Sequence, residues 1–414
     1  MNNSPTLAIK EYDRLRIASV RDLDRLLISE YDAVVLQTIE YKEKHIFVRK
    51  GNCIIAQQFV GVLKLPDFDI EILPKVSGCS SYTETRRILL DMLMAVSGIR
   101  NNNLAGSSTP ERHGIQEILI GRFLSALEEY VGSGLLRGYQ KVDRRSPIIK
   151  GKINFSRQTK NFNPVPTTFE CRFSKYISDI PINRFFVLCL RQMIVMTGSS
   201  VNAGRIKSLL ETFFDIKQMS MQEALERKIS FNVINRSAKL PYDIGYLFLS
   251  GFYVSLYAGK ISISAIIFDM NDLFEEYIYH VIRKVYGNGV YYQYEGGSLL
   301  KDEQNRVYSK MRPDIVISTS DTEKKTVIDT KWKKPDGFSS SGDLYQMNGY
   351  STCMADADII YLLYPQSPEA EKICRDYTFV DNRNIGRQLR IRCVDLQKCQ
   401  NQNSLSGYIK GLFG

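Results

Sequence analysis

The segment RPDIVISTSDTEKKTVIDTKWKKP, residues 312–335, places Asp314, Asp329 and Lys331 on two apolar runs joined by a polar turn. Because side chains alternate between the faces of a strand, Asp329 and Lys331 share a face, and antiparallel pairing about the turn would bring Asp314 beside Asp329. Two carboxylates at one point suit Mg²⁺, with the Thr330 backbone carbonyl as a further oxygen ligand. A metal-bound water would be the nucleophile, and Lys331 could orient it or stabilise the anionic transition state of phosphate hydrolysis.

The same pattern has a simpler explanation. An Asp-x-Lys pair on an exposed strand face is commonly a solvated ion pair that contributes less than about 1 kcal/mol. Val327, Ile328 and Trp332 instead predict a central strand. A charge in a central strand is costly unless it is paired or binds a metal. These neighbours favour the metal site.

Polar residues on two predicted helices add to this group. Gln346 and Tyr350 are four residues apart in the helix GDLYQMNGYSTCMA, so they share a face and could reach a water, the lysine or a phosphate. Glu275, in the helix DLFEEYIYH, could supply another carboxylate. An ordinary solvated helix glutamate fits that position equally well.

The elements that must position these residues belong to a long chain of globular composition. Its 414 residues predict two or three domains, and 44% apolar with 24% charged residues is unlike a disordered chain. No run of about 18 apolar residues could span a membrane. The start, MNNSPTLAIKEYDRL, lacks a signal-peptide pattern. We therefore expect a cytoplasmic protein without a membrane partner.

Cysteine and histidine offer little for catalysis. The eight cysteines show no CxxC spacing, and we expect them to be reduced, buried thiols. Three widely separated histidines give little basis for a zinc site or a Ser-His-Asp triad. Any chemistry should therefore depend on carboxylates.

The hydrophobic patterns predict a multi-domain α+β fold. Residues 1–80 should form a small antiparallel β domain, interrupted by a helix at VRDLDRLL. Residues 81–260 should be mainly helical, from TETRRILLDMLMAVSGI, capped by Thr83 or Thr85, to IGYLFLSGFYVSLY, with one strand at IIKGKINF. Residues 261–414 alternate strands with helices, which predicts an α/β domain that contains the opening segment.

Positive charge is concentrated upstream of the acidic residues. Residues 269–414 hold 19 basic and 20 acidic side chains, whereas residues 1–268 hold 36 and 25. The densest basic stretch is residues 137–160, opposed only by Asp143. Its candidate contact residues are Arg137, Lys141, Arg144, Arg145, Lys150 and Lys152. They could contact DNA phosphates, contact a partner protein, or form a plain solvated face.

Several segments resemble a known family. RPD…DTK, with an upstream helix glutamate and a downstream Q-x-x-x-Y helix, resembles the PD-(D/E)xK nuclease superfamily, in particular its RecB-like branch. FVGVLKLPDFDIEILPK, GLLRGYQKVDRRSPIIKGKINF, PINRFF, MNDLFEEYI and MRPDIVI…VIDTKWK further resemble the McrC family, the nuclease subunit of McrBC restriction systems. The resemblance covers most of the chain in order.

The resemblance implies a role for each candidate residue. Asp314 and Asp329 match the metal-binding acids, Lys331 the catalytic lysine, Gln346 and Tyr350 the Q-x-x-x-Y pair, and Glu275 the helix glutamate. The implied cofactor is Mg²⁺ or Mn²⁺. The implied partner is a McrB-like AAA+ GTPase hexamer that recognises modified double-stranded DNA. In that family the N-terminal part of the McrC-like subunit enters the hexamer and stimulates GTP hydrolysis, and the C-terminal domain cuts the DNA.

Two observations from the sequence agree with separate tasks for this chain and a partner NTPase. The chain has no GxxxxGK[ST] loop, so a nucleotide-driven step must come from another protein. Because residues 269–414 are not basic, they should bind DNA weakly alone, and we expect little cleavage without the partner. Two alternatives remain open: a non-catalytic adaptor that activates the NTPase, and a stand-alone RecB-like repair nuclease.

Overall fold

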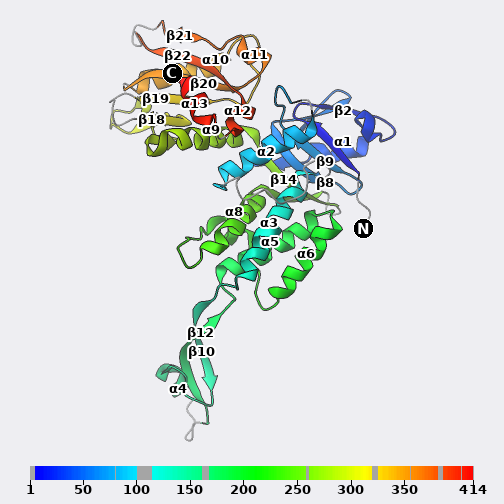
Figure 1. Ribbon diagram of the computed structural model, residues 1–414, viewed down its shortest axis with the longest axis vertical. Helices are drawn as coiled ribbons and strands as arrows, with labels where there is room; N and C mark the ends of the chain where they lie inside the picture. The colour runs from blue at the N-terminus through cyan, green and yellow to red at the C-terminus, as the bar shows by residue number, and fades with distance from the viewer. Residues whose placement is uncertain are drawn as a thin grey trace. The chain divides into compact units, whose positions relative to one another are not determined.

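The chain folds into two compact units (Figure 1). The computed structural model describes residues 5–79, 81–99, 114–160, 167–257, 261–318, 325–354, 356–380, 386–401 and 403–413. One unit is Leu119–Ser250, and the other combines Asn2–Ile118 with Gly251–Gly414. The architecture is a mixed α+β fold with several sheets, as the sequence predicts. The predicted turn TSDTEKK lies outside the described residues except for Lys325.

A five-stranded sheet organises the N-terminal part of the larger unit. Its strands, in spatial order, are β1 (Thr6–Lys10), β9 (Asp69–Leu73), β8 (Phe59–Lys64), β14 (Ile261–Asp269) and β13 (Phe252–Tyr257). The sheet is mixed rather than purely antiparallel, because β1 and β9 run parallel. Buried residues such as Ile9, Ile70, Leu63 and Ile267 form part of one apolar core beneath it.

Smaller elements complete this region. They are β2 (Arg14–Ile17), β3 (Leu27–Ile28), α1 (Glu30–Gln37), β4 (Glu40–Tyr41), β5 (Lys44–His45), β6 (Phe47–Lys50) and β7 (Cys53–Ala56). The expected helix at VRDLDRLL is wrong: only the short 3₁₀ turn Leu23–Arg25 forms there. The helix instead begins at Glu30, because Ser29 and Asp32 form a reciprocal capping box.

Long helices follow the N-terminal strands. α2 (Tyr82–Val96) is capped by Ser81, whose Oγ accepts from the Glu84 backbone N–H, so neither Thr83 nor Thr85 is the cap. α3 spans Ile115–Gly132. The smaller unit continues with α5 (Pro181–Met196), α6 (Ser200–Thr212), α7 (Met221–Glu226) and α8 (Lys239–Gly251). The run IGYLFLSGFYVSLY is not one helix, because α8 ends at Gly251 and β13 follows.

A β ribbon lies between α3 and α5 in the chain. β10 (Gly138–Ser146) pairs antiparallel with β12 (Phe169–Ile177), and β11 (Lys152–Ile153) joins β12; α4 (Phe155–Lys160) follows β11. The sequence predicts only one strand here, at IIKGKINF. Most positions along β10 are exposed, so its sequence lacks the apolar pattern that would predict a strand.

The C-terminal part of the larger unit contains a six-stranded sheet. Its spatial order is β15 (Val290–Tyr292), β18 (Ile315–Ser318), β19 (Lys325–Thr330), β20 (Ala357–Pro365), β22 (Gln388–Val394) and β21 (Asp376–Thr378). β19, β20 and β22 run parallel, and the remaining pairs are antiparallel. Further elements are α9 (Met270–Tyr286), β16 (Ser298–Lys301), β17 (Val307–Lys310), α10 (Ser341–Cys353), α11 (Pro368–Glu371), α12 (Leu396–Gln400) and α13 (Leu405–Phe413).

Two helices position the residues of interest on this sheet. Val316 and Val327 form an apolar cluster with Met347 and Tyr350 of α10. α9 contacts β15 and β19. Because strand positions alternate, Asp314 and Asp329 lie on the same face as Val316 and Val327, the face toward α10.

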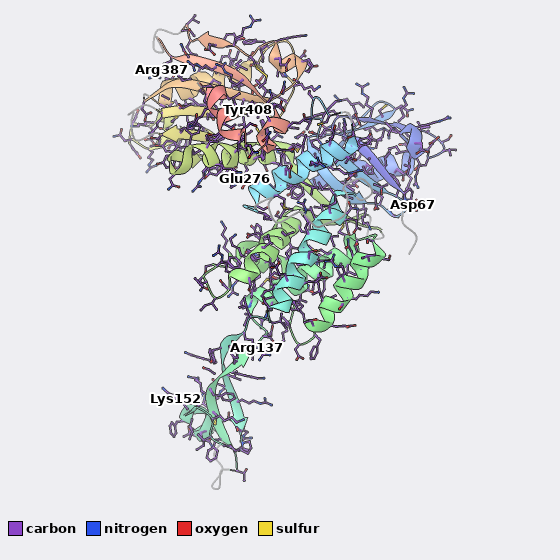
Figure 2. All side chains as sticks on the ribbon, in the orientation of Figure 1. Asp67, Arg137, Lys152, Glu276, Arg387 and Tyr408 are labelled. Carbon is purple, nitrogen blue, oxygen red and sulfur yellow. A yellow bond between two sulfur atoms is a disulfide. The ribbon has the colours of Figure 1, made fainter. Side chains whose placement is uncertain are left out.

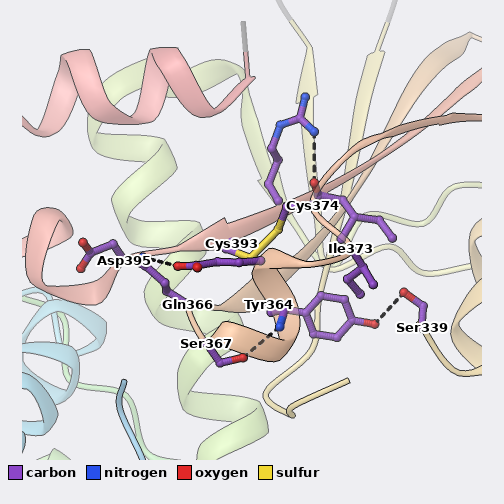
Figure 3. Close-up of a disulfide and its surroundings, with 12 residues drawn as sticks. Ser339, Tyr364, Gln366, Ser367, Ile373, Cys374, Cys393 and Asp395 are labelled. Carbon is purple, nitrogen blue, oxygen red and sulfur yellow. Dashed lines mark hydrogen bonds between the residues drawn. A yellow bond between two sulfur atoms is a disulfide. The ribbon is translucent and has the colours of Figure 1, made fainter. Parts of the chain in front are cut away.

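Two of the eight cysteines are not free thiols. Cys374 and Cys393 form a disulfide near Tyr364 and Gln366 (Figure 3). The expectation that all cysteines stay reduced is therefore wrong for this pair. The other six are free, and Cys79, Cys171, Cys189 and Cys399 among them are buried. Among the described residues, no helix is both long and apolar enough to cross a membrane.

Candidate active site

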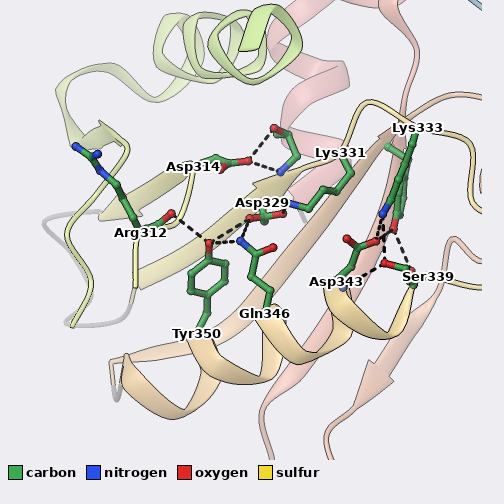
Figure 4. Close-up of polar contacts among 12 residues, drawn as sticks. Arg312, Asp314, Asp329, Lys331, Lys333, Ser339, Asp343, Gln346 and Tyr350 are labelled. Atoms are coloured by element: carbon green, nitrogen blue, oxygen red, sulfur yellow. Dashed lines mark hydrogen bonds and ion pairs between the residues drawn. The ribbon is translucent and has the colours of Figure 1, made fainter. Parts of the chain in front are cut away.

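The antiparallel pairing of β18 and β19 brings the two aspartates together. Ile315 lies opposite Ile328 in this antiparallel pair. Asp314 directly precedes Ile315 and Asp329 directly follows Ile328, so the two aspartates also lie opposite each other. Figure 4 shows Asp329 beside Lys331, with Gln346 and Tyr350 reaching Asp329 from α10, and Asp314 on the neighbouring strand segment. The predicted group of five residues is therefore one cluster in space.

Asp314 is fixed by the neighbouring strand. Its Oδ2 accepts hydrogen bonds from the backbone N–H of Thr330, at 2.7 Å, and from the Thr330 hydroxyl, at 2.9 Å. Burial raises the pKa of Asp314, while the hydrogen bonds from Thr330 and the charge of Lys331 partly oppose that rise. The Thr330 hydroxyl was not predicted to take part, because nothing in the sequence distinguishes it from an ordinary strand threonine.

Asp329 is the most enclosed acid of the cluster, with a side chain that is 0% exposed. Its Oδ1 accepts from Gln346 Nε2 and from the Tyr350 hydroxyl, each at 3.2 Å. Its Oδ2 lies 2.5 Å from Lys331 Nζ and has no other well-oriented hydrogen bond among the described residues. Burial and the charge of Asp314 raise the pKa of Asp329 to about 7. One oxygen is thus held by the protein and the other is left for a cation.

Lys331 is the cation that now contacts this oxygen. Burial alone would lower the pKa of Lys331, but the adjacent Asp329 carboxylate outweighs that effect and raises it. The lysine is therefore protonated at neutral pH. It can act as an ammonium that attracts anionic oxygens, with 23% of its side chain exposed to approaching groups.

Gln346 and Tyr350 form a hydrogen-bonded support for Asp329. α10 starts at a Ser340 cap, and the four-residue spacing then turns both side chains toward the sheet. Gln346 Nε2 donates to the Tyr350 hydroxyl at 2.8 Å as well as to Asp329. The Tyr350 hydroxyl in turn lies 3.1 Å from the Arg312 carbonyl. These contacts fix the Asp329 carboxylate rather than offering a free hydroxyl.

Glu275 lies near this cluster without joining it. Its Oε1 accepts from Gln293 Nε2 at 3.1 Å. Burial raises the pKa of Glu275, and the charge of Asp314 raises it further. Gln293 has a φ of 46°, which is rare for a residue other than glycine, and its backbone N–H donates to the Asp314 carbonyl. Gln293 thus links Glu275 to Asp314, and no sequence pattern predicted it.

The donor set fits a hard divalent cation with few protein ligands. Within the described part of the chain, no three His, Cys, Asp or Glu side chains converge to hold a metal. Two opposed carboxylates remain, with the Thr330 carbonyl as the other predicted ligand. The ammonium on Asp329 Oδ2 shows that this buried oxygen attracts a cation. Such a sparse set of oxygen ligands matches Mg²⁺, which keeps several of its waters.

The basic candidates lie elsewhere, on or beside the β ribbon. Arg137, Lys141, Arg144, Arg145, Lys150 and Lys152 are all exposed. Figure 2 shows Arg137 at the start of the ribbon and Lys152 farther along it. Lys141 and Arg145 share one face of β10, whereas Arg144 lies on the other. The six residues therefore do not form one continuous basic face.

A family model identifies the family of this chain. The model of the McrBC 5-methylcytosine restriction system component matches residues 54–365, more than half of the chain. The chain therefore belongs to the McrBC family. No curated protein matches.

Among solved structures, the chain is similar to chains from assemblies of McrB and McrC. A half-complex of the tetradecameric assembly of Thermococcus gammatolerans McrB AAA+ hexamers with bound McrC matches with a TM-score of 0.67 at 20% identity, over 99% of both chains. A second structure, the McrBC complex of the same organism, matches with a TM-score of 0.49 at 22% identity, over 67% of this chain and 87% of that one. The first likeness extends the shared fold over nearly the whole chain.

Proposed function

We propose that the chain is the DNA-cutting subunit of a McrBC-type restriction system and hydrolyses phosphodiester bonds with Mg²⁺ or Mn²⁺. The observation that carries this proposal is the opposed pair of carboxylates, Asp314 half-buried and Asp329 fully buried, with the Lys331 ammonium on Oδ2 of Asp329. The helix–sheet arrangement around them is proposed to be a PD-(D/E)xK nuclease domain.

Each residue of the cluster has a distinct task in this proposal. Asp314 and Asp329, with the Thr330 carbonyl, would hold the metal, which when bound supplies Lewis-acid activation of water and of the phosphate. Thr330 orients Asp314, and the α10 pair orients Asp329. The protonated Lys331 stabilises the negative charge that develops on the phosphate oxygens.

Glu275 is assigned a weaker role. It lies within electrostatic range of Asp314 but hydrogen-bonds to Gln293. We propose that Glu275 adds negative charge at the edge of the site. There its carboxylate can accept a proton or orient a water.

The proposed partner is a McrB-like AAA+ GTPase that recognises modified DNA and whose GTP hydrolysis this chain stimulates. Family membership and the likeness to a McrC bound to McrB AAA+ hexamers support this. The chain has no phosphate-binding loop of its own. We further propose that the β10–β12 ribbon contacts the partner, since its basic and aromatic side chains are exposed.

The test reconstitutes the chain with its candidate AAA+ partner, nucleotide, Mg²⁺ and methylated plasmid. Wild type is compared with Asp314→Ala and Lys331→Ala, while cleavage and NTP hydrolysis are measured together. Loss of cleavage with intact stimulation of NTP hydrolysis is expected. Lys334→Ala is the matched control, because it removes a similar charge from a half-exposed position three residues away.

The same experiment separates the alternatives. If Asp314→Ala and Lys331→Ala both cut as wild type does, the cluster is a structural salt bridge, and the adaptor function is favoured. If the isolated chain cuts efficiently without a partner, a stand-alone nuclease is favoured.

A further inference from the structure

The turn after β1 reaches the strand that carries the candidate active site. Glu11 is fully buried, and both of its carboxylate oxygens accept from the indole N–H of Trp332, at 3.2 and 2.9 Å. Glu11 is itself anchored: its N–H donates to the Leu73 carbonyl, and its Oε1 accepts from the Lys75 N–H. Trp332 is therefore attached to a fixed point of the N-terminal sheet.

Trp332 is linked to two candidate active-site residues through their neighbours in the chain. It directly follows Lys331 in the chain. Its ring packs on Phe274 of α9, with ring centroids 5.2 Å apart, and Phe274 directly precedes Glu275. Only 5% of the Trp332 surface is exposed. Its ring packs the segment that follows β19 against α9.

The helix is attached to the same sheet. β14 pairs with β8 and runs directly into α9, whose N-cap is Asp269. Asp269 also pairs with Lys44 at 2.9 Å, and Asp272 of α9 pairs with Lys42 at 3.0 Å. The N-terminal region thus contacts both the helix that carries Glu275 and the segment directly after β19 that carries Lys331.

We propose that Glu11 is a positioning residue for DNA cleavage: by holding Trp332, it sets the place of Lys331 relative to Glu275. This inference rests on the proposed function. The Glu11–Trp332 contact would make cleavage depend on an intact N-terminal sheet, although none of the proposed reacting groups lies in that sheet. Misplacing a reacting group by as little as about 1 Å can cost on the order of a hundredfold in rate.

The experiment uses the full chain with its AAA+ partner, nucleotide, Mg²⁺ and methylated plasmid. Glu11→Ala is expected to lower the single-turnover cleavage rate by about tenfold or more, with stimulation of NTP hydrolysis and the DNA concentration for half-maximal cleavage unchanged. Glu11→Gln keeps an acceptor for the indole and should restore most of the rate. Glu71→Gln is the control, because Glu71 is an equally buried carboxylate of the same sheet that binds Arg86 instead.

Fluorescence gives a second measurement that does not depend on activity. Trp332 is the only tryptophan, so emission reports this contact directly. Glu11→Ala should shift the emission and increase quenching by acrylamide, and Glu71→Gln should do neither. If Glu11→Ala does not fold, Trp332→Phe takes its place, since it keeps a ring against Phe274 but removes the N–H donor.

The outcomes separate the two proposals. A folded Glu11→Ala or Trp332→Phe variant that cuts at the wild-type rate would overturn the positioning role. Strictly additive losses in the double variant would also overturn it, because two halves of one contact should not add. Asp329→Ala is the reference: if it too cuts normally, the proposed function itself is wrong.

Discussion

The acid–lysine cluster and the β ribbon are both rich in charge, but the structure surrounds their charges in opposite ways. Asp329 is fully buried and paired on both oxygens. On the ribbon, Arg145 lies 3.6 Å from Glu170 with 57% of its side chain exposed. A buried charge costs stability unless it is paired or binds a metal, whereas an exposed charge stays solvated by water. Burial therefore distinguishes the two regions better than the number of charges does.

The strongest test of this contrast is removal of the most buried acid. Asp329→Ala should lower cleavage by about a thousandfold or more, because several kcal/mol of transition-state stabilisation depend on the metal it would hold. Cleavage of methylated plasmid with the partner present measures this. Asp376→Ala is the control, since that carboxylate pairs with Arg392 and is half exposed. Equal losses of cleavage in Asp329→Ala and Asp376→Ala would contradict the idea that burial distinguishes the functional charges.

A second prediction concerns pH and another buried carboxylate. Burial raises the pKa of Glu11 to about 7 from its ordinary 4.5. Its contribution to stability is therefore complete below pH 4.5 and is lost as the pH rises toward 7. The full change amounts to at most about 3 kcal/mol.

The free energy of unfolding, measured against pH for wild type and Glu11→Gln, tests this. The difference between the two proteins should change across that window and be constant above it. A difference that does not vary with pH would show that folding leaves the pKa of Glu11 at its ordinary value.

A smaller effect is expected from the support of Asp329. Tyr350→Phe removes one donor to Oδ1 and leaves Gln346 in place. The cleavage rate should fall by about tenfold, the equivalent of one hydrogen bond to a charged group. Tyr377→Phe is the matched control, because that hydroxyl donates to the Ile373 carbonyl. No loss in Tyr350→Phe would mean that Gln346 alone suffices.

The smallest effect on stability is expected at the ribbon. Replacing Arg144, Arg145, Lys150 and Lys152 together by alanine should change the unfolding free energy by no more than about 0.5 kcal/mol per site, because all four are exposed. Stimulation of NTP hydrolysis should weaken if the ribbon contacts the partner. If DNA affinity and its salt dependence fall instead, the ribbon contacts phosphates. No change in either property would indicate a solvated face.

The sequence predicts the candidate active-site cluster better than its surroundings. Asp329 lies in the apolar strand β19, Asp314 directly precedes β18 and Lys331 directly follows β19. The period and pairing of these strands determine which side chains meet. Gln346 and Tyr350 follow from helical spacing alone. Gln293 could not be predicted, because a left-handed glutamine has no local signal. The Glu11–Trp332 contact joins residues 321 positions apart, beyond the reach of periodicity.

The same limit applies to the fold. Long amphipathic helices such as α2 and α9 were predicted where they occur. The ribbon strands β10 and β12 were missed because few of their side chains are buried. The family resemblance is confirmed by the family match, while the assigned roles of the site residues stay predictions.

The passage of β14 directly into α9 limits how this protein can be divided or recombined. A fragment starting at residue 261 would keep β14 but lose its partner strand β8. The buried side chains of Ile263 and Ile267 would then face solvent beside an unpaired strand edge, which favours aggregation. The C-terminal portion is thus not an exchangeable module, and a chimera that keeps its fold should also retain the N-terminal strands.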